Sequence, residues 1–65
     1  MWMVLHVTEG EKTAELIQEL LLREGFLVKV EPFVLDNTKA SIMHIMVLSS
    51  EVEEARKVLI ENGYV

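Results

Sequence analysis

The sequence predicts an α+β fold, in which two helices cover one face of an antiparallel sheet. Two runs, residues 2–7 and Ile42–Leu48, are almost continuously apolar, which is typical of strands that have water on neither side. A third run, residues 27–34, alternates between apolar and charged residues and predicts a half-exposed strand. Helical patterns follow the run at residues 2–7 and the run at Ile42–Leu48. We therefore expect one domain over residues 1–65 with the order strand, helix, strand, strand, helix.

The small size of the chain indicates that it needs help to reach stability. A domain of 65 residues buries only about 60% of the surface that its unfolded chain exposes. The chain has no Cys and two His, which excludes disulfides and thiolate ligands and leaves little for a structural metal. Hydrophobic residues nevertheless make up 51% of it. We therefore expect part of the apolar surface to be buried by another subunit.

The charge balance argues against two classes of partner. Six Lys and Arg oppose eleven Asp and Glu, which gives a net charge of −5. An acidic surface repels phosphate backbones and anionic lipids, so we expect neither nucleic acid nor a membrane as partner. The apolar residues 1–7 are too short to span a bilayer, and no basic residue precedes them. We expect a cytoplasmic protein.

The first helix is predicted over residues 11–24. Thr8 and Glu11 have the spacing of a capping box at its start. Gly25 stands where a left-handed residue would end the helix, with Phe26 placed for the hydrophobic contact that accompanies such an end. The apolar stripe of this helix consists of Ala14, Ile17, Leu20 and Leu21.

The second strand is predicted to lie at an edge of the sheet. Pro32 cannot donate a hydrogen bond to a neighbouring strand. The polar run 36–39 is rich in turn-forming residues and connects this strand to the third one as a hairpin. Alternation separates two pairs of side chains onto opposite faces: Val28 and Val30 on one, Lys29 and Glu31 on the other.

The second helix is predicted over residues 51–62. Ser50 and Glu53 repeat the capping-box spacing, and Gly63 ends the pattern. Residues 64–65 are the stub of a possible fourth strand. The apolar stripe consists of Val52, Ala55, Val58 and Leu59.

The order of these elements predicts a topology. A right-handed crossover from the first strand to the second leaves a gap, which the third strand fills as the hairpin partner of the second. The result is a ferredoxin-like βαββα(β) two-layer sandwich, with the first and third strands central, both helices on one face, and a fourth strand that is short or absent.

The face of the sheet away from the helices is the candidate binding surface. Periodicity leaves open which side of the two apolar strands the helices cover. Our preferred assignment buries Met3, Leu5, Val7, Met43, Ile45 and Val47 beneath them. The opposite face then carries the candidate ligand or interface residues, Trp2, Val4, His6, Ile42, His44, Met46 and Leu48. This patch exceeds what a monomer normally exposes, and a second copy related by a two-fold axis is the simplest cover. The inverse assignment would place both histidines under the helices.

His6 and His44 fall on the same face of adjacent strands in this assignment, which raises the alternative of a metal or catalytic site. A metal site needs a third ligand, and Glu31 is the only carboxylate expected nearby. We therefore favour interface histidines and predict no metal and no cofactor. The sequence also has no nucleophile–base signature, glycine-rich phosphate loop or helical His-Glu motif, so we expect no enzyme. A small enzyme with His44 as general base stays the third possibility.

Two stretches carry a family resemblance. Residues 4–7 followed by 11–17 and 20–26, and then residues 45–59, resemble the small bacterial signal-transducing domains that are distantly similar to PII nitrogen-regulatory proteins. The resemblance covers nearly the whole chain and rests on positions that determine the fold. It implies a ferredoxin-like fold and a regulatory or binding role. PII proteins act through a long loop between the second and third strands, whereas the corresponding loop here spans only about residues 35–40.

These observations together predict a homo-oligomeric regulatory or interaction module, with a dimer through the open sheet face favoured. The alternative is a sensor for a small ligand (an amino acid, a nucleotide or a metal) with its site at the subunit interface near His6 and His44. A partner protein also remains possible.

Overall fold

The computed structural model describes residues 1–33 and 42–65. The predicted turn at residues 36–39 lies outside the described residues. The elements are β1 (Trp2–Glu9), α1 (Glu11–Arg23), β2 (Val28–Phe33), β3 (Ile42–Leu48), a single 3-10 turn (Ser49–Glu51) and α2 (Val52–Glu61).

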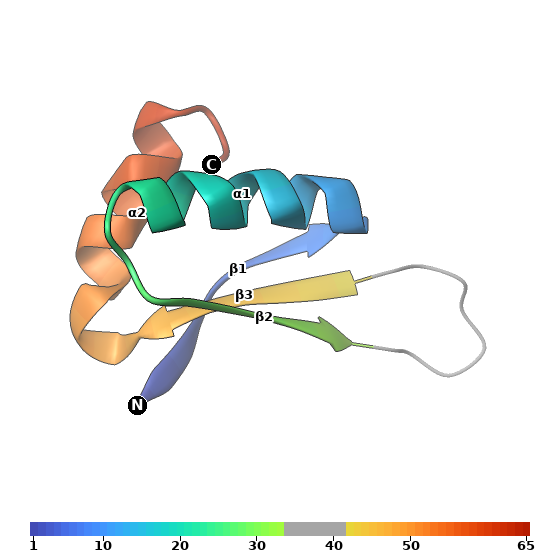
Figure 1. Cartoon of the computed structure of the whole chain (residues 1–65), viewed down its shortest axis with the longest axis horizontal. Helices are drawn as coiled ribbons and strands as arrows, with labels where there is room; N and C mark the ends of the chain where they lie inside the picture. Colours follow the sequence, from blue (N-terminus) through green and yellow to red (C-terminus); the bar gives the residue numbers. More distant parts are fainter. Residues whose placement is uncertain (34–41) are drawn as a thin grey trace.

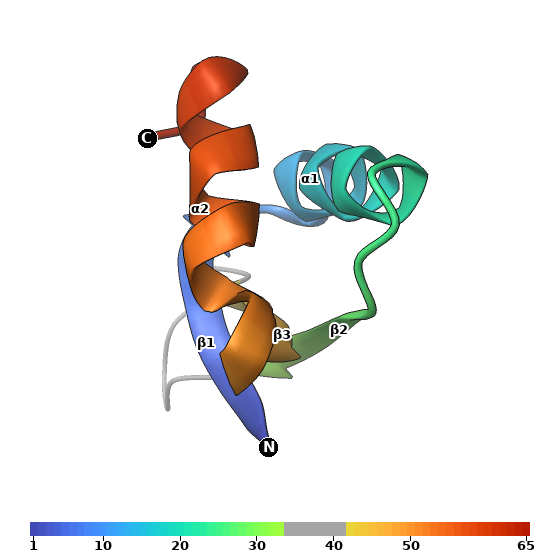
Figure 2. The same cartoon turned by 90° about the vertical axis from the view of Figure 1, so that its left-hand side faces the viewer.

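The described strands form one antiparallel sheet in the order β1-β3-β2, with β3 in the middle. Both helices lie on the same side of this sheet, as Figure 1 shows. In the view of Figure 2, α1 is seen end-on while α2 runs upright, so the two helices are steeply inclined to each other. The predicted α+β class, with an antiparallel sheet and helices on one face, is confirmed.

The position of β1 differs from the prediction. Within the described residues, β1 pairs only with β3 and is therefore an edge strand rather than a central one. Residues 64–65 form no strand along its other side. Tyr64 donates its backbone N–H to the Leu59 carbonyl at 2.9 Å and packs against the core.

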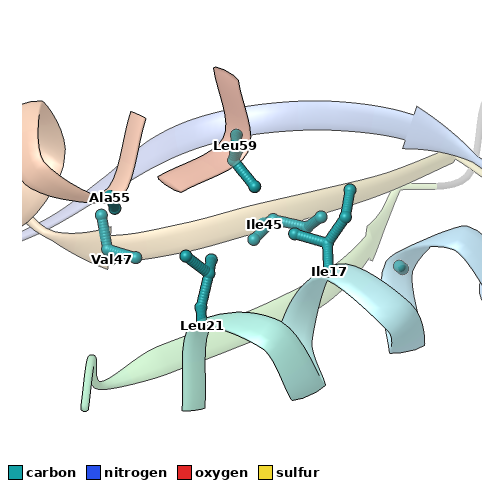
Figure 3. Close-up of a cluster of buried hydrophobic side chains, with 7 residues drawn as sticks. Ile17, Leu21, Ile45, Val47, Ala55 and Leu59 are labelled. Atoms are coloured by element: carbon teal, nitrogen blue, oxygen red, sulfur yellow. The ribbon is translucent and has the colours of Figure 1, made fainter. Parts of the chain in front are cut away.

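The core lies between the sheet and the helices and is built from the predicted stripes. Figure 3 shows Ile17 and Leu21 projecting from α1 toward β3 and α2. Ile45 and Val47 of β3 are fully buried beneath them, so the assignment of these two residues to the helix side was correct. The buried cluster consists of Ala14, Ile17, Leu21, Ile45, Val47, Ala55 and Leu59.

A β-bulge at Leu5 changes the alternation of β1. Val4 lies opposite Met46, but His6, two residues further on, lies opposite the adjacent Ile45, so the register shifts by one residue. Leu5 itself packs against the core as predicted. On the face away from the helices, β1 therefore presents even-numbered residues before the bulge and odd-numbered residues after it.

The predicted burial of β1 is wrong at two positions. Beyond the bulge the assignment is inverted: Val7 lies opposite His44, on the face away from the helices, and its side chain is 50% exposed. Met3 lies opposite Val47 and so belongs to the helix side, but it is 45% exposed. Its exposure follows from the position of β1 at the edge, where no further strand adjoins it among the described residues.

The helix ends confirm the glycine predictions. Gly25 has φ of +92°, its N–H donates to the Leu22 carbonyl, and the Phe26 N–H donates to the Leu21 carbonyl at 3.0 Å. This is the Schellman pattern, and Phe26 packs against the core beside it. Gly63, with φ of +78°, ends α2 with the equivalent pair of hydrogen bonds.

Neither predicted capping box forms. β1 continues through Thr8 to Glu9, so Thr8 pairs with Met43 and its hydroxyl donates to the Glu9 carbonyl instead of capping α1. Gly10 occupies the N-cap position of α1 with φ of +84° and no side-chain cap. The 3-10 turn likewise displaces Ser50 from the start of α2, and Glu51 becomes the N-cap residue.

We expect Leu21→Ala to lower the free energy of unfolding by about 2–5 kcal/mol, because it opens a cavity beneath α1. Leu16→Ala on the same helix is the matched control. Leu16 is 48% exposed, so its loss should be close to zero. Urea denaturation followed by circular dichroism measures both, and similar losses in the two variants would contradict the assigned core.

We expect Gly25→Ala to lower the free energy of unfolding by about 1 kcal/mol, because a side chain at positive φ is strained. No neighbouring atom lies within 4 Å of the position that the alanine Cβ would occupy, so backbone conformation is the only cost. Gly25→Asn should lose less, since Asn tolerates this region better. The same denaturation measurement ranks the three proteins, and equal stability of all three would contradict the Schellman end.

Candidate functional site: the open face of the sheet

The candidate site is the sheet face away from the helices, which we call the open face. Cross-strand partners share a face, so the register with β3 assigns each strand residue to one side. The open face consists of Trp2, Val4, Val7 and Glu9 from β1, Ile42, His44, Met46 and Leu48 from β3, and Lys29, Glu31 and Phe33 from β2.

Six of the seven predicted site residues belong to this face: Trp2, Val4, Ile42, His44, Met46 and Leu48. His6 is the exception. The bulge places it opposite Ile45, on the helix side, whereas His44 stays on the open face. The predicted pairing of the two histidines on one face is therefore wrong, because the bulge reverses the alternation between them.

Alternation had already set Lys29 and Glu31 together on one face of their strand, and three further members of the open face were missed by sequence reasoning. Phe33 could have been found, because the alternation of Lys29 and Glu31 continues to it along β2. Val7 and Glu9 could not, because their place depends on the bulge at Leu5, and no glycine or other local signal indicates that bulge.

Exposure is concentrated on the flanks of the open face. The exposed fractions are 37% for Trp2, 44% for Val4 and 45% for Phe33. The β3 residues between them are half-buried by their neighbours. Large apolar side chains in contact with water on three adjacent strands form a continuous patch, and such patches mark interaction surfaces.

One ion pair lies on this apolar face. The Lys29 Nζ is 2.9 Å from the Glu31 Oε1, and both side chains are about half exposed at 48%. The same Nζ is 5.9 Å from the centre of the Trp2 ring, so the Lys29 side chain reaches from β2 across β3 toward β1. Because the pair is half in water, it contributes little to stability.

His44 is held by an aromatic neighbour. Its ring stacks on Phe33, with ring centroids 5.2 Å apart and planes 7° from parallel. Glu31 is its in-register neighbour on β2. The open face thus presents an imidazole stacked on an aromatic ring, with a glutamate at the paired position of the neighbouring strand.

The described residues show no other element of a chemical site. Residues 1–33 and 42–65 contain no group of three His, Cys, Asp or Glu side chains close enough to hold a metal ion. The part of the chain that the structure describes also encloses no pocket. No helix within it is both long and apolar enough to cross a membrane.

Comparison with protein-family models, with curated proteins and with solved structures finds no match to this chain.

We expect Phe33→Leu to move the ring-proton resonances of His44 downfield, because the stacked ring that shields them is removed. His6 lies on the other side of the sheet and should keep its resonances, which makes it an internal control. Two-dimensional NMR spectra of the two imidazoles measure the shifts. Equal changes at both histidines would contradict the assigned faces.

Proposed function

We propose that this protein is a non-enzymatic, homo-oligomeric regulatory or interaction module of the cytoplasm, and that the open face binds the same face of a second copy. The observation that carries the proposal is the contrast between the two faces of one sheet. On the central strand β3 the helices bury Ile45 and Val47 completely, while Ile42, His44, Met46 and Leu48 on the open face stay partly exposed. Burial of such a surface is the main driving force of association.

A second copy is the favoured occupant because the patch can bury itself. Two-fold symmetry brings the same surface of both copies together, so one apolar patch needs no separate partner to match it. Sheets pack face to face about 10 Å apart with their strands within about 30° of each other. The open face extends over β1, β3 and β2 and offers the apolar side chains that such packing uses.

The size of the open face predicts a weak dimer. Three strands about 4.8 Å apart and about 23 Å long cover roughly 300 Å² in projection per copy. Side-chain relief enlarges this area, but the total stays near or below the roughly 1,200 Å² at which stable interfaces begin. We therefore expect dissociation in the micromolar range or weaker, which suits a regulated assembly.

The finer fold and the regulatory role are part of the same proposal. The order β1-β3-β2, with antiparallel pairing and two helices on one face, is compatible with a ferredoxin-like sheet that lacks its fourth strand. The resemblance of residues 4–7, 11–17, 20–26 and 45–59 to bacterial signal-transducing domains supports regulation rather than catalysis.

A small-ligand sensor is the second candidate, and the stack of His44 on Phe33 favours it. An amino acid, nucleotide or divalent metal bound beside this stack would stabilise the folded state by mass action. A thermal-shift screen with these three classes tests it. A rise in melting temperature that His44→Gln abolishes would support the sensor, and no rise with any class would exclude it for those ligands.

We expect wild-type protein to show a concentration-dependent increase in mass by light scattering between about 10 μM and 1 mM, as the weak interface predicts. Val4→Glu should weaken this association at least about tenfold, because it places an unpaired charge in the apolar interface.

Leu16→Glu is the matched control, since Leu16 is 48% exposed on α1 and Val4 is 44% exposed on the open face. It should associate like wild type. Circular dichroism establishes that both variants are folded. A wild-type protein that stays monomeric over the whole range would contradict the proposal, as would equal weakening by the two substitutions.

A further inference from the structure

The strand register arranges the open face in rows that run across the strands. Residues directly opposite one another on neighbouring strands belong to one row. From one end of the sheet to the other, the rows are Trp2 and Leu48; Val4, Met46 and Lys29; Val7, His44 and Glu31; and Glu9, Ile42 and Phe33.

The charged residues lie on the two outer strands of this arrangement. Lys29 and Glu31 stand in the two middle rows, both on β2. Glu9 stands in the last row on β1, at the opposite end of that strand from Trp2. The residues of β3 on this face are apolar except for His44, and most of those of β1 are apolar. A two-fold interface must place each of these charges against a defined residue of the partner.

Two orientations of a two-fold axis in the plane of the interface make opposite predictions. An axis along the strands lays β2 on the partner's β1, which sets Lys29 against the partner's Val4 and Glu31 against the partner's Val7. The ion pair within each copy would survive there, but its two charges would lie against apolar side chains of the partner and lose part of their water, which is unfavourable. An axis across the strands, between the two middle rows, lays β2 on the partner's β2.

We propose that the dimer forms about this second axis, so that Lys29 of each copy pairs with the partner's Glu31. The inference rests on the open-face dimer and defines its geometry. The same axis sets Val4 against the partner's Val7, and Trp2 beside the partner's Glu9, where the indole N–H can donate to a carboxylate. Each charge thus meets an opposite charge or a hydrogen-bond donor, and Val4 and Val7 meet apolar residues.

The distances are within reach of these side chains. Lys29 and Glu31 are two residues apart on one strand, so their backbones are separated by about 6.7 Å, and packed sheets lie about 10 Å apart. The Lys29 Nζ already extends over the open face to within 5.9 Å of the Trp2 ring centre. Exchange of the 2.9 Å pair within each copy for two pairs between copies keeps the number of ion pairs unchanged. Association therefore gains apolar burial without leaving a charge unpaired.

The ion pairs determine orientation more than affinity. β2 forms the edge of the sheet, so these pairs lie at the rim of the interface, where water still reaches them. Exposed pairs contribute little free energy, but like charges placed opposite each other are strongly unfavourable. A reversal of charge is thus the sensitive probe of this geometry.

The experiment uses two full-length variants, Lys29→Glu and Glu31→Lys. Lys29→Glu sets only acidic residues at this rim in a homodimer, and Glu31→Lys sets only basic ones. Each variant alone should dimerise at least about tenfold more weakly than wild type. An equimolar mixture should form a heterodimer at least about tenfold more readily than either homodimer, because every rim charge then faces its opposite. Native mass spectrometry of one labelled and one unlabelled variant counts the three species.

The mixture separates contacts between copies from contacts within one copy. Repulsion inside each variant persists in the heterodimer, so a preference for the heterodimer can arise only across the interface. The doubly reversed variant, K29E with E31K, should dimerise like wild type. Circular dichroism verifies the fold of each variant, and both positions are half exposed, so the fold should tolerate them.

The outcomes distinguish this geometry from the proposed function. A strong heterodimer preference supports the exchanged ion pairs. Statistical mixing, with wild type dimeric and Val4→Glu monomeric, overturns the axis across the strands and leaves the open-face dimer intact. Wild-type protein that is monomeric at all concentrations overturns the dimer and its geometry together.

Discussion

The pairing of β3 with both other strands is the constraint on which the rest of the described structure depends. Its odd-numbered residues Ile45 and Val47 are fully buried beneath the helices, so the register of both neighbours is set by which β3 residue each one meets. A shift of one residue would turn every side chain of a strand to the opposite face. Because one face of β3 is buried, such shifts are strongly disfavoured. The even-numbered residues of β3 are consequently held on the open face.

The bulge at Leu5 is the one place where β1 departs from this regularity, and it has consequences for the site. It lets β1 contribute Leu5 to the core and still present both Val4 and Val7 to the open face. It also separates His6 from His44, which removes the pair of imidazoles that would have formed the basis of a metal site. A bulge of this kind re-aims side chains at the edge of a sheet. In this protein the bulge places His6 on the helix side and Val7 on the open face, which makes the open face more apolar.

The open face combines features that favour self-association over the binding of a small molecule. The described residues enclose no pocket, so a ligand on this face would have little of its own area buried. Another sheet face can cover more of the apolar side chains than a small molecule can. The ion pair of Lys29 with Glu31 adds polarity at the β2 edge, where the rim of an interface would lie. This pair makes the two edges of the face different, so that a partner can be oriented on it. Affinity and orientation would therefore come from different residues.

The sequence by itself determined the elements of this fold, because each depends on neighbours along the chain. Alternation at Val28 to Glu31 predicted a half-exposed strand, and Pro32 placed it at an edge. The stripe through Ile17 and Leu21 predicted the buried side of α1, and Gly25 predicted its end. Six residues of the open face followed from the same reasoning. The predicted capping boxes did not form, because β1 includes Thr8 and the 3-10 turn includes Ser50. The extent of β1 depends on its pairing with β3, and the extent of the turn depends on how α2 docks.

Only the tertiary structure decided which face each half of β1 presents. Residues 2–7 are apolar on both sides, so hydrophobicity cannot distinguish one register from another. Leu5 packs against the buried cluster, which combines residues of both helices and β3, so the choice depends on residues far apart in the sequence. The place of His6, Val7 and Glu9 follows from that contact. Most residues of the surface that we propose for self-association thus follow from the alternation of the sequence, whereas packing decides which β1 residues complete it.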